Sequence, residues 1–206
     1  MNATKWGIYI GRFQPFHNGH LKQIKAAFYE AGCQRLLILI GTKLELNRTL
    51  RNPFVYSECR EMIINNFKPE EVFKIRVDVV FDQSSDSLWA YEVNEKIYKY
   101  VGEYDPIVLM GDYSDPEATY LKYLSEYIYM HKWGQPTNPE GLHAKDIRAI
   151  LFGTNGGWQD YGIAPTPRWE KIQHLVPKST LRFLEKFAQT DEYAMLRKEY
   201  ESHTAH

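Results

Sequence analysis

Residues 5–20 constrain the fold of this chain more strongly than any other stretch of its sequence. Trp6, Ile8 and Ile10 alternate with smaller or polar residues, a pattern that predicts a short buried strand. From Gly19 onward the apolar residues follow helical spacing instead, at Leu21, Ile24, Ala27, Phe28 and Ala31. Glycine and proline between the two patterns favour a tight loop. The stretch therefore predicts a strand that runs through a loop directly into a helix.

Two histidines and an arginine lie in this loop and at the start of the predicted helix. His17 and His20 are three residues apart, a spacing that places two helical side chains on one face. A helix start also presents free backbone N–H groups and partial positive charge, so the histidines and Arg12 together predict a cradle for phosphate. A metal site is the first alternative, but it needs a third ligand, and no cysteine or carboxylate lies nearby in the sequence. Two surface histidines without a role are the second alternative.

The residues Gly11–His20, GRFQPFHNGH, resemble the signature of the HxGH nucleotidyltransferase superfamily. Their Arg-Phe-Gln-Pro-Phe version is similar to that of nicotinamide-mononucleotide adenylyltransferases of the archaeal and bifunctional (adenylyltransferase plus Nudix) type. The resemblance implies that Arg12, His17 and His20 act in catalysis, together with Arg148 farther along the chain. It also implies that four of their neighbours contact ATP, namely Gly11, Phe13, Gln14 and Gly19.

The composition bounds the number of domains and the kinds of partner. With 206 residues, 44% of them hydrophobic, the chain can bury one sizeable core. We expect a nucleotidyltransferase domain over residues 1–175 and a helical extension over 176–206 packed on it, and no Nudix pattern is present in the chain. A net charge of −1 gives no footprint for a polyanion, which argues against nucleic acid as a partner.

Cysteine usage and hydropathy indicate the compartment. Cys33 and Cys59 fit free buried thiols in a reducing environment better than a disulfide framework. No signal peptide is visible, and the longest apolar run, Leu36–Ile40, is far too short to span a bilayer. We therefore expect a cytoplasmic protein.

Strand and helix patterns alternate along the rest of the chain. Apolar runs predict further strands at 35–40, 73–81, 106–111 and 127–133. Helical spacing predicts helices at 55–67, 88–101 and 142–152, and again beyond Pro177 and from Asp191. This order predicts an α/β fold with a doubly wound, five-stranded parallel sheet and a C-terminal helical segment. The resemblance implies the Rossmann-like form found in nucleotidyltransferases. The Gly/Pro-rich stretch 154–168 predicts a long flexible loop.

The loop after the second predicted strand is a candidate for binding the second substrate. It spans residues 42–54 and carries Lys43, Arg48 and Arg51, and loops after strands bind ligands in open α/β sheets. A solvated basic loop is the alternative. The Asn52-Pro53-Phe54 sequence that closes it is similar to an Asn-Pro-Phe element of the family.

The resemblance implies a mononucleotide site formed by Asn52, Phe54, Arg51, Asp82 and Trp89. In the related adenylyltransferases a tryptophan in the position of Trp89 stacks on the nicotinamide ring, and a flat aromatic ring binds a planar cation well. A core tryptophan that faces the sheet is the alternative.

Two later segments complete the ATP site that the resemblance implies. Gly111 and Asp112 follow the fourth predicted strand, in a segment similar to the family's Gly-His-x-x-Asp-x-Ser-Ser-x-Tyr-Leu, and Asp112 stands where histidine is common. Farther along, Ile147 and Arg148 match the end of the family's Ile-Ser-x-Thr-x-Ile-Arg, whose helix start and arginine hold the ATP phosphates.

The same segment departs from the family at two positions. His143 and Lys145 replace the serine and threonine, so ionisable groups stand in place of hydroxyl donors. Backbone N–H contacts survive such a change, and Lys145 adds a positive charge for a triphosphate. An altered nucleotide preference, a loss of activity, or two solvated side chains without a role are the alternatives.

The resemblance and the site chemistry together predict an adenylyltransferase. We expect it to join nicotinamide mononucleotide to the AMP moiety of ATP, giving NAD and pyrophosphate by direct in-line transfer. Mg²⁺ would be held through the phosphates and not by protein side chains. ATP, the mononucleotide and NAD are the expected ligands. We expect no binding to nucleic acid or membrane, and the sequence leaves open whether the protein forms a homo-oligomer. Alternatives are an enzyme of the same fold with another acceptor, such as pantetheine phosphate, or with CTP as donor, and a non-catalytic NAD-binding module.

Overall fold

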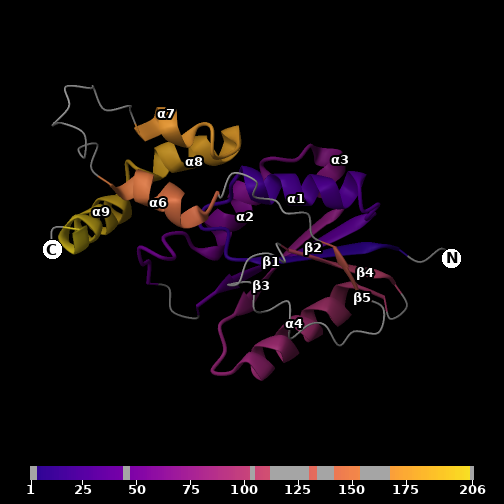
Figure 1. Ribbon diagram of the computed structural model, residues 1–206. Coiled ribbons are helices and arrows are strands. Elements are labelled where there is room, and N and C mark those ends of the chain that lie inside the picture. Colours follow the sequence, from indigo (N-terminus) through magenta and orange to yellow (C-terminus); the bar gives the residue numbers. More distant parts are fainter. Residues whose placement is uncertain are drawn as a thin grey trace. The chain divides into compact units, whose positions relative to one another are not determined.

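The computed structural model describes residues 4–43, 47–102, 105–111, 130–133, 142–153 and 168–204 (Figure 1). Its contacts divide the chain into two compact units. The first unit comprises residues 1–12, 19–45 and 67–140, and the second comprises residues 13–18, 46–66 and 141–206. The linear division predicted at residue 175 falls inside the second unit, because contacts between segments far apart in the sequence define that unit.

The first unit is built on a parallel sheet. Its strands are β1 (Trp6–Gly11), β2 (Arg35–Thr42), β3 (Ile75–Phe81), β4 (Ile107–Met110) and β5 (Met130–Trp133), in the order β3-β2-β1-β4-β5. Every neighbouring pair is parallel, which confirms the predicted α/β class with a parallel sheet. The chain moves outward on one side of β1 to β3 and then continues on the other side with β4. Ligands in such sheets bind at this change of direction, outside the carboxyl ends of the strands.

Helices cover both faces of this sheet, as the predicted doubly wound arrangement requires. Figure 1 shows α1 (Asn18–Tyr29) and α3 (Pro69–Val72) on one face and α4 (Asp86–Tyr100) on the other. The short helix α3 occupies sequence for which no helix was predicted. α4 begins two residues earlier than predicted, because the Ser85 hydroxyl accepts the Leu88 N–H at 3.3 Å and so caps the helix.

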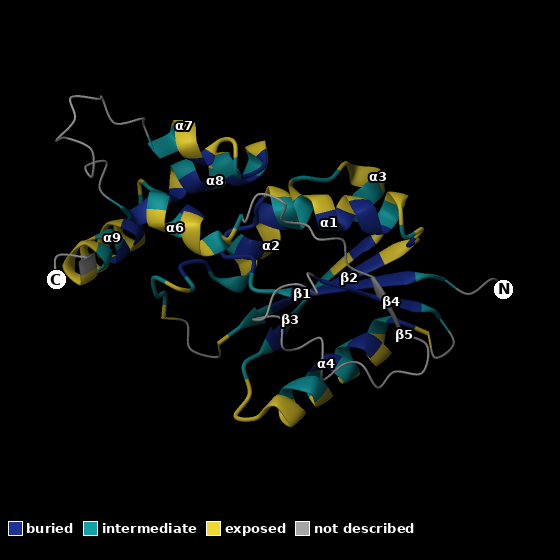
Figure 2. Ribbon diagram, viewed as in Figure 1, coloured by how far each residue is buried: buried dark blue, intermediate teal, exposed yellow. Residues whose placement is uncertain are grey.

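Alternate residues of β1 form the core between the sheet and α4. Trp6, Ile8 and Ile10 pack with Val93 and Ile97 of α4, all of them buried. β1 and β2 are buried along most of their length (Figure 2). Burial on both sheet faces explains why their sequences are nearly continuous in apolar residues.

The second unit is helical. It contains α2 (Tyr56–Ile64), α6 (Ala144–Phe152), α7 (Arg168–Ile172), α8 (Lys178–Phe187) and α9 (Asp191–Thr204). α2 packs on α8, and α6 packs on both α7 and α9. Aromatic rings join these helices, among them Phe54, Phe183, Phe187 and Tyr193. The predicted flexible loop lies outside the described residues except for Arg168, which begins α7.

No helix among the described residues is long and apolar enough to cross a membrane. Cys33 and Cys59 are both buried free thiols, as the sequence predicts.

Candidate functional site

His17 is a buried residue at the end of the loop that precedes α1. Because α1 begins at Asn18, His17 stands outside the helix, and the predicted one-face spacing with His20 does not apply to it. Its side chain is only 7% exposed. Burial, with a smaller contribution from the charge of His143, lowers the pKa of His17 to about 4. His17 is therefore neutral near pH 7, so it offers a hydrogen bond to a phosphate and no positive charge.

His20 lies in the first turn of α1 and is half-buried. Its imidazole contacts the ring of Tyr9 edge-on, with centroids 6.1 Å apart. Tyr9 belongs to β1, so the strand and the helix of the first unit together orient this histidine near the carboxyl end of the strand.

Arg12 is ion-paired at the carboxyl edge of the sheet. Its Nη2 donates to both carboxylate oxygens of Asp82, each at 3.0 Å. The two side chains are 39% and 33% exposed, so water and salt weaken the pair. The Arg12 Nη1 atom is buried and has no hydrogen-bond partner among the described residues. Arg12 and Asp82, to which the resemblance assigns different functions, thus lie in direct contact. An anion that binds Arg12 Nη2 would compete with Asp82 for it.

Gln14 is buried, and both the nitrogen and the oxygen of its side-chain amide form hydrogen bonds. Its Nε2 donates to the Phe54 carbonyl at 2.7 Å, and its Oε1 accepts the Phe54 N–H at 2.9 Å. Its neighbour Phe13 has a φ of 52°, a left-handed conformation that is rare and costly for a residue other than glycine. The loop between β1 and α1 is therefore held by these hydrogen bonds, because the backbone of Phe13 does not favour this conformation by itself.

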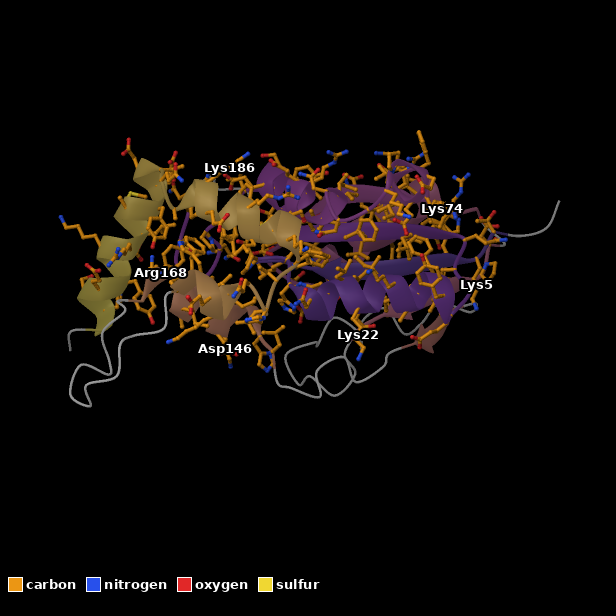
Figure 3. The ribbon with its side chains drawn as sticks, turned by 90° about the horizontal axis from the view of Figure 1, so that it is seen from above. Lys5, Lys22, Lys74, Asp146, Arg168 and Lys186 are labelled. Atoms are coloured by element: carbon orange, nitrogen blue, oxygen red, sulfur yellow. The ribbon has the colours of Figure 1, made fainter. Side chains whose placement is uncertain are left out.

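Arg148 joins this loop to α6. Its Nη1 donates to the Gln14 main-chain carbonyl at 2.6 Å. Burial, and then the nearby charge of Arg51, lower the pKa of Arg148, while Asp146 opposes this shift. Asp146 lies on the exposed side of α6 (Figure 3). Arg51 and Arg148 thus form a cationic group within the second unit.

His143 and Lys145 are exposed at the start of α6. His143 is the N-cap residue, but its side chain forms no capping hydrogen bond, so backbone N–H groups of the first turn remain for another acceptor. His143 is close enough to influence the pKa of His17. The start of α6 therefore lies close enough to His17 for a charge on His143 to act on it.

Several other predicted site residues have buried side chains. Phe13, Phe54 and Ile147 are at most 3% exposed and belong to the core, so their side chains are not available to a ligand. Phe54 packs on Phe183 and Phe187 of α8, with centroids 5.7 and 5.1 Å apart. Gly111 is also buried. Asp112 lies outside the described residues.

The remaining candidates for the mononucleotide site are more accessible. Trp89 is partly buried on the first turn of α4 and packs against the core on that face of the sheet, in line with the core alternative. Asn52 belongs to a tight turn in which its N–H donates to the Thr49 hydroxyl at 3.1 Å. Arg51 is exposed.

Arg48 has a structural role that the sequence did not reveal. Its guanidinium forms a fork with the Glu58 carboxylate, at 2.6 and 2.9 Å, and lies over the ring of Phe187. Glu58 also accepts the Val55 N–H at the start of α2. Arg48 is thus committed to holding the 47–54 loop, and only its position in a basic loop was visible in the sequence.

Comparisons with known proteins identify the family of this chain. Residues 8–148, more than half of the chain, match the model of the cytidylyltransferase-like family. The nicotinamide/nicotinic acid mononucleotide adenylyltransferase of Acinetobacter baylyi is 25% identical over 193 residues, which cover 94% of this chain and 92% of that protein. The nicotinamide-nucleotide adenylyltransferase of Saccharolobus solfataricus is 29% identical over 178 residues, 85% of this chain and 94% of that protein.

A solved structure supports the fold. A bifunctional NMN adenylyltransferase/ADP ribose pyrophosphatase from Francisella tularensis, crystallised with AMP and a manganese ion, superposes with a TM-score of 0.73 at 22% identity. The match covers 97% of this chain but only 53% of that one, so this chain spans about half the length of the Francisella protein. The resemblance to archaeal and bifunctional adenylyltransferases seen in the loop signature is confirmed. The chain belongs to the cytidylyltransferase-like family of nucleotidyltransferases.

Proposed function

We propose that this protein transfers the adenylyl group of ATP to nicotinamide mononucleotide, giving NAD and pyrophosphate. The observation that carries the proposal is the arrangement of Gly11–His20. The central strand β1 ends at the carboxyl end of the sheet, and the chain continues through a loop held by Gln14 into α1. Near full-length similarity to two named mononucleotide adenylyltransferases supports it.

The reaction needs little covalent chemistry from the protein. An oxygen of the mononucleotide phosphate attacks the α-phosphorus of ATP, a new P–O bond forms, and the bond from that phosphorus to the bridging oxygen breaks as pyrophosphate leaves. The attacking oxygen is already an anion, so no general base is required. Catalysis therefore depends on alignment of two polyanions and on stabilisation of the charge on the leaving group.

Residues of the second unit would bind the triphosphate. The first turn of α6 offers backbone N–H groups, and Lys145 and His143 stand beside them on the exposed side. Arg148 has one nitrogen on the Gln14 carbonyl, and its other N–H groups would donate to phosphate oxygens. His17 would donate one neutral hydrogen bond.

Residues of the first unit would act at the reacting end. His20, on the first turn of α1, would donate to the transferring phosphoryl group. Arg12 would exchange its pairing with Asp82 for phosphate oxygens as the nucleotide binds, which leaves Asp82 to accept a hydrogen bond from the mononucleotide. The part of the Trp89 ring that the core leaves exposed and the Asn52 side chain would contact the mononucleotide, and Arg51 would act through its charge. Phe54 would not contact it, because its side chain is buried and its N–H and carbonyl are bound to Gln14.

Mg²⁺ would enter with the nucleotide. Among the described residues no group of three or more His, Cys, Asp or Glu side chains is placed to hold a metal ion. The ion would be carried by phosphate oxygens, and it would neutralise charge on the triphosphate when bound. The buried free thiols Cys33 and Cys59 fit a reducing compartment, and we propose the cytoplasm on that ground.

The test is release of pyrophosphate from ATP in the presence of each acceptor separately, with and without Mg²⁺. We expect release with nicotinamide mononucleotide or its acid form, and NAD or its acid analogue as the second product. Release only with pantetheine phosphate, or only with CTP as donor, would replace this proposal with another reaction of the same fold. Binding of NAD by calorimetry without any release of pyrophosphate would make the protein a non-catalytic binding module.

A further inference from the structure

Gln14 joins three segments that are far apart in the sequence but belong to the same compact unit. Its side-chain amide binds both the N–H and the carbonyl of Phe54, 40 residues away. Its main-chain carbonyl accepts from Arg148, 134 residues away. Only 5% of Gln14 is exposed, so this amide has little access to a ligand. The loop before α1, the 47–54 loop and α6 therefore meet at one buried residue.

We propose that Gln14 is a positioning residue for nucleotide binding. It fixes the loop that carries His17, and it fixes the carbonyl that orients the Arg148 guanidinium. This inference rests on the proposed function, because it assigns to Gln14 the alignment of two groups that would contact the triphosphate. It differs from the expectation drawn from the resemblance, in which Gln14 itself contacts ATP.

Three observations show that the loop needs this support. Phe13, directly before Gln14, adopts the left-handed conformation, which persists only where the surroundings impose it. Arg148 is partly buried, so a displaced Gln14 carbonyl would leave this charge without one of its acceptors. Phe54, the partner of the Gln14 amide, is itself held between α8 side chains, Phe183 and Phe187. Phe54 is therefore fixed by its packing, and a displacement of Gln14 would also displace His17 and Arg148.

Gln14→Glu tests the amide with little change in shape. The carboxylate still accepts the Phe54 N–H, but its second oxygen faces the Phe54 carbonyl and repels it. At about pH 8 we expect kcat/KM for ATP to fall about tenfold or more, because a misalignment of about 1 Å costs on the order of 10²-fold. As the pH is lowered toward about 6, we expect recovery relative to the parent enzyme, because a buried carboxyl group has a raised pKa and once protonated can donate to that carbonyl.

Gln14→Met and Tyr193→Phe complete the set of variants. Gln14→Met keeps the length of the side chain and removes both hydrogen bonds to Phe54. We therefore expect the same fall in kcat/KM at all pH values. Tyr193→Phe is the matched control, because it also removes two side-chain hydrogen bonds in the same unit, far along the chain from Gln14. The Tyr193 hydroxyl donates to the Leu151 carbonyl at 2.9 Å and accepts from Arg168. We expect Tyr193→Phe to lower the unfolding temperature and to leave kcat and both KM values unchanged.

The outcomes separate positioning from simple support of the fold. Gln14 variants that lose stability but keep parental kinetics, as the control does, would overturn the proposal, and so would a Gln14→Glu variant without pH recovery. Failure of both Gln14 variants to fold would also overturn it, since Gln14 would then be a folding residue. If the parent enzyme releases no pyrophosphate, the proposed function fails separately. The affinity of each variant for ATP, measured by calorimetry, then decides whether Gln14 positions the nucleotide-binding groups.

Discussion

Two histidines in one short motif have different chemical properties in this protein. His17 is buried and neutral at pH 7, whereas His20 is half-buried on the first turn of α1 against Tyr9. A neutral imidazole donates one hydrogen bond without adding charge. In the predicted phosphate cradle His17 would therefore donate a hydrogen bond without charge, and the cationic part of the proposed site falls to arginine and lysine.

His20→Ala should slow the chemical step. We expect kcat to fall about 10²-fold or more, the usual effect of removing one donor to the transition state. The measurement is initial-rate kinetics of pyrophosphate release with ATP and nicotinamide mononucleotide saturating. A kcat within a few-fold of the parent value would exclude His20 from the chemistry, provided that circular dichroism shows the variant to be folded.

His17 should make the fold sensitive to acid. Its folded pKa of about 4 lies below the ordinary value of 6.5, so the unfolded chain binds more protons between these values. The contribution of His17 is complete above pH 6.5 and is lost as the pH falls toward 4, by about 3 kcal/mol in total. Urea unfolding at several pH values should show this loss in the parent and a smaller one in His17→Gln.

His143→Ser offers a separate check of the same electrostatics. Removing the imidazole beside His17 should raise the pKa of His17 by part of its shift, because burial is the larger cause and persists. NMR titration of the His17 ring protons measures this directly. No change in the pKa of His17 would show that the two side chains do not interact.

At the scale of elements, the central strand is packed too closely to accept a side chain at Gly7. A methyl group there would overlap Leu36 Cδ2 of β2 and would lie 3.0 Å from Met110 Sδ of β4. Gly41, at the end of β2, is the matched control, because the nearest atom to an added methyl group is 3.8 Å away.

Gly7→Ala should therefore destabilise the protein and Gly41→Ala should not. We expect a loss of about 1–3 kcal/mol for Gly7→Ala, the usual cost of overpacking a core. For Gly41→Ala we expect a change within about 0.5 kcal/mol. Equilibrium denaturation of both variants gives these values, and equal stabilities would mean that the sheet adjusts freely around β1.

Element boundaries show where local sequence signals are sufficient. β1 begins at Trp6 and α9 begins at Asp191, as the sequence patterns predict. The start of α4 was predicted two residues too late, because only the hydrogen bond from the Leu88 N–H to the Ser85 hydroxyl identifies the cap.

At the scale of the whole molecule, the metal should be needed for turnover and not for folding. Because the ion would enter with the nucleotide, EDTA should leave the unfolding temperature of the nucleotide-free protein unchanged. The same chelator should abolish pyrophosphate release, and added Mg²⁺ should restore it. A fall in the unfolding temperature with EDTA alone would reveal a structural metal site.

The family, the parallel α/β sheet and the loop signature could all be read from residues that are close together in the chain. Gly11–His20 carries its chemistry within ten consecutive positions, and strand and helix periods are local properties of the backbone. By contrast, the contacts Gln14–Phe54, Gln14–Arg148 and Arg12–Asp82 span 40, 134 and 70 residues. No local pattern encodes such pairs, because burial and partner choice arise only when the chain has folded. For that reason the sequence predicted candidate residues for the site, while only the folded structure showed that His17 is buried and that Gln14 contacts Phe54 and Arg148.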